Sequence, residues 1–92
     1  MGYMNIEKIH EDEHYIIYSY SRDGGISDGI IKIKKTFCDL ENINEWYCNN
    51  VELTPSSTDI KNVFAMKAIV FIAKIFNKDT WDFPDKYMFA FG

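Results

Sequence analysis

The segment HYIIYSYSR at residues 14–22, with DGGISDG at 23–29 and GIIKIKK at 29–35, decides the fold of this chain. The first piece is rich in aromatic and β-branched residues, which favour strands. The second gathers three glycines and two aspartates, residues suited to the positive φ and the side-chain-to-backbone hydrogen bonds of tight turns. The third alternates isoleucine with lysine, as a strand does when one face is buried and the other is in water. Together the three pieces predict an antiparallel hairpin.

The stretch before the hairpin contains HEDEH at residues 10–14, which matches the zinc-protease pattern H-E-x-x-H. In that pattern two histidines one helical turn apart bind the metal, and the glutamate acts as a general base. Three consecutive acids would leave such a helix with no apolar side to pack on a core, and the chain has only two histidines. We therefore interpret HEDEH as a polar turn that joins a first strand, residues 3–9, to the hairpin. His10 and His14 are only a weak candidate for a surface metal site, and no cofactor is expected.

Residues 36–53, after the hairpin, follow no single period. Their larger apolar side chains recur at a helix-like spacing of three: Phe37, Leu40, Ile43 and Trp46. Acidic and amide residues interrupt this pattern, and a further strand fits residues 46–53. A short helical turn and a loop with another hairpin arm are therefore alternative predictions for this segment.

The sequence TPSSTD at residues 54–59 marks the start of a helix. It combines a proline with several side chains that cap helices, immediately before a long apolar stretch. Because Thr54 precedes a proline, it is expected to be extended, and the cap follows it. The predicted helix begins at Ser57 and extends to about Asn77, with Ser56 or Ser57 as its N-cap.

Apolar side chains cover most of this predicted helix, because Lys67, Lys74 and Lys78 fall together on one stripe. Its longest uninterrupted apolar run, Ala68–Ala73, is far shorter than the roughly 20 residues that span a bilayer. A membrane helix is therefore not expected. One small sheet covers only about half of a helix, so we expect the other side to contact a second subunit or a partner protein.

The chain ends with YMFAF at residues 87–91, whose alternation predicts a last strand. Ninety-two residues are too few to form two cores, so residues 1–92 are expected to form one domain. Seven Phe, six Tyr and two Trp are enough to fill its core. The predicted fold is α+β: a small antiparallel sheet of about four strands packed against one long helix in the C-terminal half.

The net charge of −4 limits the choice of partner. Residues 1–46 carry nine acids against five bases, whereas residues 47–92 carry five of each, so the first half holds the whole acidic excess. An acidic domain repels phosphate backbones. The one basic cluster, Lys32, Lys34 and Lys35, is typical of the solvated face of a strand, and nucleic-acid binding is therefore not expected.

The two cysteines, Cys38 and Cys48, have nine residues between them, which is too many for a zinc knuckle. The N-terminus lacks the basic and apolar segments of a signal peptide. We therefore expect a cytoplasmic protein with both thiols free. Thirteen Ile and nine Lys against a single Arg suggest a low-GC bacterial source.

Aromatic residues beside acids supply the candidate binding surface. Tyrosine and tryptophan offer rigid contact area at low entropic cost, and nearby carboxylates attract a basic partner. Such residues occur in the hairpin, in the irregular segment and in the loop before the last strand. The partner-binding candidates are Tyr18, Tyr20, Trp46, Tyr47, Trp81 and Asp82.

No catalytic arrangement is visible in the sequence, since neither histidine is placed beside a nucleophile and the glycine-rich loop does not match a phosphate-binding motif. In size and acidity the chain resembles the small bacterial immunity proteins, which neutralise a basic toxin by direct contact, although no motif carries this likeness. The resemblance implies a non-enzymatic protein-binding module whose partner is a basic toxin domain. Two alternatives are a homodimer of structural or ligand-binding role, assembled through the helix Ser57–Asn77, and an enzyme that uses carboxylates.

Overall fold

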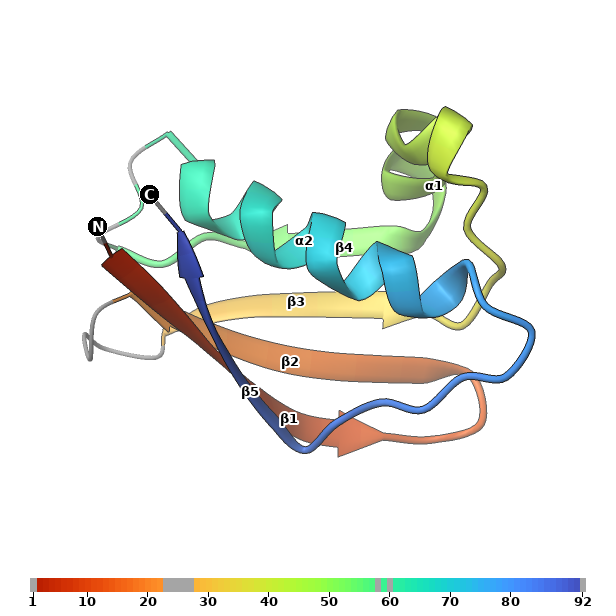
Figure 1. Cartoon of the computed structure of the whole chain (residues 1–92), viewed down its shortest axis with the longest axis horizontal. Helices are drawn as coiled ribbons and strands as arrows, with labels where there is room; N and C mark the ends of the chain where they lie inside the picture. Colours follow the sequence, from red (N-terminus) through yellow and green to blue (C-terminus); the bar gives the residue numbers. More distant parts are fainter. Residues whose placement is uncertain (1, 23–27, 58, 60, 92) are drawn as a thin grey trace.

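Figure 1 shows the computed structural model, which describes residues 2–22, 28–57, 59 and 61–91. In these residues five antiparallel strands form one sheet in the order β4-β3-β2-β1-β5, and both helices lie on the same side of it. The elements are β1 (Gly2–Glu11), β2 (Tyr15–Arg22), β3 (Gly29–Lys34), the 3₁₀ turn η1 (Leu40–Asn42), α1 (Ile43–Asn50), β4 (Val51–Thr54), α2 (Val63–Phe76) and β5 (Lys86–Phe91). The α+β class is confirmed, but the sheet has more strands than predicted and a short helix accompanies the long one.

The predicted hairpin is confirmed, since β2 and β3 pair antiparallel with Tyr20 opposite Gly29. Alternate residues of β3 are buried, whereas Lys32 and Lys34 lie on the opposite face of the sheet. Gly29 is required by packing, because a Cβ at this position would overlap the ring of Tyr20. The predicted turn at residues 23–27 lies outside the described residues.

The first strand extends beyond its predicted range, residues 3–9, and includes His10 and Glu11. It is a central strand that pairs with both β2 and β5, and Met4 and Ile6 are buried in the core. Its pairing with β2 continues to Glu11, with a register shift between Lys8 and His10. Backbone pairing therefore keeps the polar end of this strand extended, although its side chains alone do not predict it.

Residues 36–54 contain both of the predicted alternatives. The turn η1 and helix α1 are followed directly by β4, which pairs with β3. Trp46 of α1 is only 5% exposed, and its indole Nε1 donates to the carbonyl of Thr36 at 3.0 Å. This anchored ring supplies the apolar contact that a helix rich in acids and amides needs in order to pack.

Helix α2 begins at Val63, later than the predicted Ser57, and spans 14 residues. Ser56 and Ser57 do not cap it, because their hydroxyls donate to the carboxylate of Asp28 at 2.5 and 2.6 Å. Both serine hydroxyls therefore bind Asp28, which is distant in sequence, instead of the helix N–H groups. The predicted N-cap is wrong for this reason.

The carboxylate of Asp59 takes the place of the predicted cap. It accepts the backbone N–H groups of Phe64 at 3.2 Å and Ala65 at 2.9 Å. The hydroxyl of Tyr20 also donates to it, at 2.9 Å. Asn62 lies between Asp59 and the helix in the left-handed conformation, with φ of 58°. Asp59, which is 4% exposed, therefore fastens the first turn of α2 to the sheet.

Helix α2 covers the sheet with one side and leaves its other side open. The buried side consists of Ala65, Ala68, Ile69, Ile72, Ala73, Ile75 and Phe76. On the opposite side Val63, Met66 and Val70 are 47%, 38% and 43% exposed. The uncovered apolar side that the sequence predicts is therefore present. Within the described part of the chain, no helix has the length and apolar character needed to cross a membrane.

Candidate functional site

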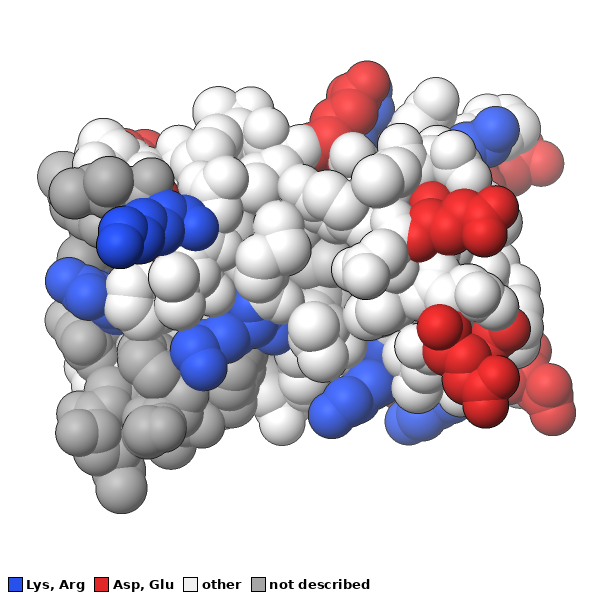
Figure 2. Space-filling view, turned by 90° about the horizontal axis from the view of Figure 1, so that it is seen from above, with Lys and Arg blue, Asp and Glu red and all other residues white. Residues whose placement is uncertain are grey.

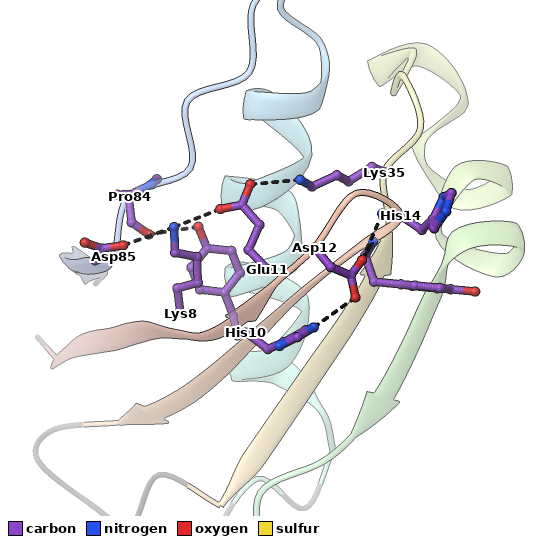
Figure 3. Close-up of polar contacts among 10 residues, drawn as sticks. Lys8, His10, Glu11, Asp12, His14, Lys35, Pro84 and Asp85 are labelled. Carbon is purple, nitrogen blue, oxygen red and sulfur yellow. Dashed lines mark hydrogen bonds and ion pairs between the residues drawn. The ribbon is translucent and has the colours of Figure 1, made fainter.

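The HEDEH segment forms the end of β1 and the turn into β2 (Figure 3). One carboxylate oxygen of Asp12 accepts the N–H groups of His14 and Tyr15, both at 2.8 Å, and the other lies 2.9 Å from Nε2 of His10. The contact with His10 and these two N–H groups lower the pKa of Asp12. The predicted polar turn is confirmed for Asp12, Glu13 and His14, whereas His10 and Glu11 belong to β1, and the zinc-protease helix does not form. Among the described residues, no three His, Cys, Asp or Glu side chains are grouped to hold a metal ion.

Glu11 joins an ion-paired cluster beside this turn (Figure 3). Its carboxylate binds Lys35 at 2.8 Å and Lys8 at 2.9 Å, and Lys8 also binds Asp85 at 3.0 Å. Lys35 and then Lys8 lower the pKa of Glu11, while the carboxylates of Glu11 and Asp85 raise the pKa of Lys8. These ion pairs connect β1 to the residues that follow β3 and precede β5. The carboxylates of this region therefore serve the fold.

Tyr18 and Tyr20 are each 1% exposed, so the expectation that they present a binding surface is wrong. The hydroxyl of Tyr18 donates to the carbonyl of Pro84 at 2.9 Å, and that of Tyr20 donates to Asp59. Burial raises the pKa of Tyr20 to about 12. The alternation of β2 places both rings on one face, and that face is the one that α2 covers.

Trp46 and Trp81 both contact Phe76, with ring centroids 5.4 and 5.1 Å from that of Phe76. Trp81 is partly buried, and its indole N–H has no hydrogen-bond partner among the described residues. Tyr47 is partly buried next to Trp46 on α1, and Asp82 is exposed next to Trp81. Four of the predicted binding residues therefore lie in the two segments that meet at Phe76. Trp46 is buried, however, so the expectation that it presents a binding surface is wrong.

Exposed carboxylates from the same two segments surround this aromatic group. We call them the acidic end: Asp39, Glu41, Glu45, Asp79 and Asp82. The segments are held together by the N–H of Cys38, which donates to the carbonyl of Phe76 at 3.2 Å, and by Asn77 Nδ2, which donates to the carbonyl of Cys38 at 2.8 Å. No carboxylate of the acidic end forms an ion pair with a described residue. Figure 2 shows acidic side chains gathered at the end of the molecule where α1 and the α2–β5 connection lie.

A hollow of about 200 Å³ opens at the acidic end beside Trp46. Its lining includes the ring of Phe37, which is 55% exposed, and the side chains of Asp39 and Glu45. Carboxylates next to an aromatic ring match the end of a lysine or arginine side chain in both charge and shape. Phe37, Asp39 and Glu45 are not among the residues predicted from the sequence, where the only signal for them is the density of acids in residues 39–45.

A second hollow, of about 210 Å³, lies where α1 meets β4. Lys32 lines it, with Nζ 4.5 Å from the centre of the Tyr15 ring and 3.9 Å from the Glu52 carboxylate. Lys34 lines it as well, but Lys35 turns to Glu11. The basic cluster noted in the sequence is therefore divided, and part of its charge is balanced within the chain.

Cys38 and Cys48 are both free thiols, as predicted. Cys38 is buried, and burial raises the pKa of its thiol. Cys48 is exposed at the second hollow. A buried thiol with a raised pKa is a weak nucleophile, so Cys38 acts as a small core side chain.

Comparisons of the chain with protein-family models, with curated proteins and with solved structures found no match.

Proposed function

We propose that this protein is a non-enzymatic protein-binding module of the bacterial cytoplasm that inhibits a basic toxin domain by direct contact. The hollow at the acidic end carries the proposal, because it places Asp39 and Glu45 beside the exposed ring of Phe37. A lysine or arginine of the partner would meet opposite charge and an aromatic surface there. Anchors of this kind contribute much of the affinity between basic and acidic proteins.

The rest of the acidic end extends this attraction beyond the hollow. Glu41, Asp79 and Asp82 are exposed and form no ion pair with a described residue. A partner therefore does not have to separate an internal ion pair in order to reach them. Uncompensated charges on one end also increase the rate of association with a basic protein, and salt weakens the effect.

Trp81 and Tyr47 provide partly apolar contact area at the same end. The indole N–H of Trp81 lacks a hydrogen-bond partner among the described residues. That nitrogen is itself buried, so the contact area comes from the rest of the partly buried Trp81 ring and from Tyr47. We expect these two residues to flank the charged contacts in the complex.

The test starts from the gene that precedes this one, which we expect to encode a larger toxin with a basic C-terminal domain. That domain is purified and titrated with this protein by calorimetry. A stoichiometric complex that weakens as salt is added supports the proposal. The double variant Asp39→Lys, Glu45→Lys should bind at least about tenfold more weakly, because it replaces attraction by repulsion.

The matched control is the double variant Glu7→Lys, Glu13→Lys, which makes the same change of net charge at two exposed positions outside the acidic end. Its affinity should equal that of the unmodified protein. Equal losses in both variants would point to net charge alone and overturn the assignment of the site. The proposal also fails if the toxin domain does not bind, or if no such gene is adjacent.

A homodimer through α2 is the second candidate, and the exposed Val63, Met66 and Val70 favour it. Three side chains fall far short of the roughly 800 Å² per partner that a stable interface buries. The homodimer therefore ranks below the binding module. Light scattering over a range of concentrations separates the two, because the dimer requires twice the chain mass of 10.8 kDa.

A further inference from the structure

The two edges of the sheet differ in how well they are protected from pairing with another strand. The β4 edge has four residues, an exposed Glu52, α1 directly before it and Pro55 after it. The β5 edge has six residues, KYMFAF, with no proline and no acid. Short length, charge and proline are the usual means by which proteins block an edge. β4 combines all three, whereas β5 has only the charge of Lys86, so β5 is the edge more open to strand addition.

The hydrogen bonds of β5 show which of its backbone groups face outward. The N–H of Lys8 donates to the carbonyl of Asp85 at 2.7 Å. Along an antiparallel ladder the bonding residues alternate, so Tyr87 bonds to β1 while the N–H and C=O groups of Lys86 and Met88 point away from it. Among the described residues, no strand pairs with this outer side.

Positive charge accompanies this open edge. Phe71 of α2 stacks on Tyr87 of β5 with ring centroids 4.0 Å apart, so this side of the helix lies next to the strand. Lys67 and Lys74 stand one turn before and one turn after Phe71 on the same side, and both are exposed. The exposed Lys86 alternates with Tyr87 and therefore projects from the other face of the sheet, opposite Glu7, so this edge carries lysines on both faces. We call Lys67, Lys74 and Lys86 the basic flank. Figure 2 shows basic side chains along the long side of the helical face, reaching as far as the acidic side chains at one end.

We infer that the β5 edge binds an extended acidic segment of another protein by strand addition. The outward backbone groups of Lys86 and Met88 would supply hydrogen bonds, and the basic flank would select glutamate or aspartate side chains in the added strand. A second copy of this chain fits less well. Pairing β5 with itself across a two-fold axis would bring the basic flanks of both copies to one interface, and like charges there are repulsive.

The inference is separate from the acidic end, which has the opposite charge and lies on other segments. The probe is a fluorescently labelled peptide that alternates glutamate with valine and matches the six residues of β5 in length. Fluorescence anisotropy should show binding by the whole protein. A peptide with lysine in place of glutamate should not bind. The variant Glu45→Lys, which damages only the acidic end, should bind the acidic peptide normally.

The decisive variants change the edge and leave the fold intact. Met88→Pro removes an outward N–H, and a proline is tolerated at such a position of an edge strand. Met88→Ala keeps the N–H and is its matched control. We expect Met88→Pro and the double variant Lys74→Glu, Lys86→Glu to bind the peptide at least about tenfold more weakly. Met88→Ala and Lys34→Glu should not differ from the unmodified protein.

Thermal unfolding of each variant verifies that it is folded before binding is compared. If Met88→Pro is unfolded, the double lysine variant decides the matter. Failure of the acidic peptide to bind the unmodified protein would overturn the inference. So would decisive variants that bind the peptide as tightly as the unmodified protein does. A dimer seen by light scattering that Met88→Pro abolishes would show that a second copy occupies the edge, and it would overturn the choice of an acidic partner.

Discussion

The HEDEH turn and the acidic end are both rich in carboxylates, yet they use them in opposite ways. In the turn, Glu11 binds two lysines and Asp12 binds two backbone N–H groups. At the acidic end, Glu45 and Asp82 form no ion pair with a described residue. A dense run of acids in a sequence therefore does not indicate availability to a partner. What decides is whether the fold places a cation or an N–H group next to the acid. We call an acid with such a partner inward-facing and an acid without one outward-facing.

The largest expected effect is at Asp59, the most buried of the inward-facing carboxylates at 4% exposure. Replacing it in Asp59→Ala leaves the Tyr20 hydroxyl and two helix N–H groups without their acceptor. We expect the free energy of unfolding to fall by about 3 kcal/mol. Urea denaturation measures this. Asp59→Asn keeps one acceptor oxygen and should lose less, and an equal loss in both variants would contradict the capping role.

A smaller effect is expected at Glu11. The variant Glu11→Ala removes the common partner of Lys8 and Lys35 and should lower the free energy of unfolding by about 1 kcal/mol, since partly exposed ion pairs contribute little individually. Glu13→Ala is the control, because Glu13 is exposed in the same turn. Its stability should stay within about 0.5 kcal/mol of the unmodified protein. An equal loss of stability in Glu11→Ala and Glu13→Ala would show that the ion pairs of Glu11 do not stabilise the fold.

Acid should destabilise the fold by protonating the carboxylates that bind other groups of the chain, such as Asp28 and Glu11. Hydrogen bonds from Ser56 and Ser57 lower the pKa of Asp28 to about 2, and Lys35 and Lys8 lower that of Glu11. Unfolded carboxyl groups titrate near about pH 4, so the unfolded chain takes up protons first. The stabilisation is therefore complete above about pH 5 and is lost as the pH falls through these lowered pKa values.

Chemical denaturation at a series of pH values measures this loss of stability. Glu11→Ala should show a shallower decline on acidification than the unmodified protein, because one of the responsible groups is absent. Parallel curves for the two proteins would mean that Glu11 does not contribute to the acid sensitivity.

The smallest effect on stability is expected at the acidic end. Glu45→Gln removes a carboxylate that is bound to no described cation, so the free energy of unfolding should change by less than about 0.5 kcal/mol. Any change should be a gain that disappears in salt, because neighbouring acids repel one another. Thermal denaturation at low and high salt measures it. A clear loss would show that Glu45 has a structural role and belongs with the inward acids.

The hairpin could be predicted from the sequence because its signals are local: alternation, strand-forming residues and turn residues lie within one short segment. The position of Tyr18 and Tyr20 could be predicted only in part from the sequence. Alternation places both rings on one face of β2, but which face meets α2 depends on packing with residues far along the chain. The start of α2 was missed for a similar reason, since Ser56 and Ser57 are good caps that Asp28 engages first.

The acidic end could be predicted only in part from the sequence. Trp46, Tyr47, Trp81 and Asp82 are found together there, but the sequence does not reveal that residues 39–45 and 79–82 are neighbours. That contact depends on two hydrogen bonds between Cys38, Phe76 and Asn77. Contacts between segments so distant in sequence leave no periodic pattern in either of them.

The environment of Tyr20 has a consequence for how this fold changes during evolution. Its ring lies against Gly29, where a Cβ would overlap it, and its hydroxyl reaches the carboxylate that begins α2. A change at any one of Tyr20, Gly29 and Asp59 disturbs the other two, so the three should be inherited as a unit. A tyrosine, a glycine and an aspartate at these intervals form a signature by which distant homologues can be found. Among the described residues at the acidic end, only Asp39 has an internal role, because its carboxylate accepts the backbone N–H of Glu41 and the side-chain N–H of Asn42. The other residues there are free to diverge as fast as the partner does.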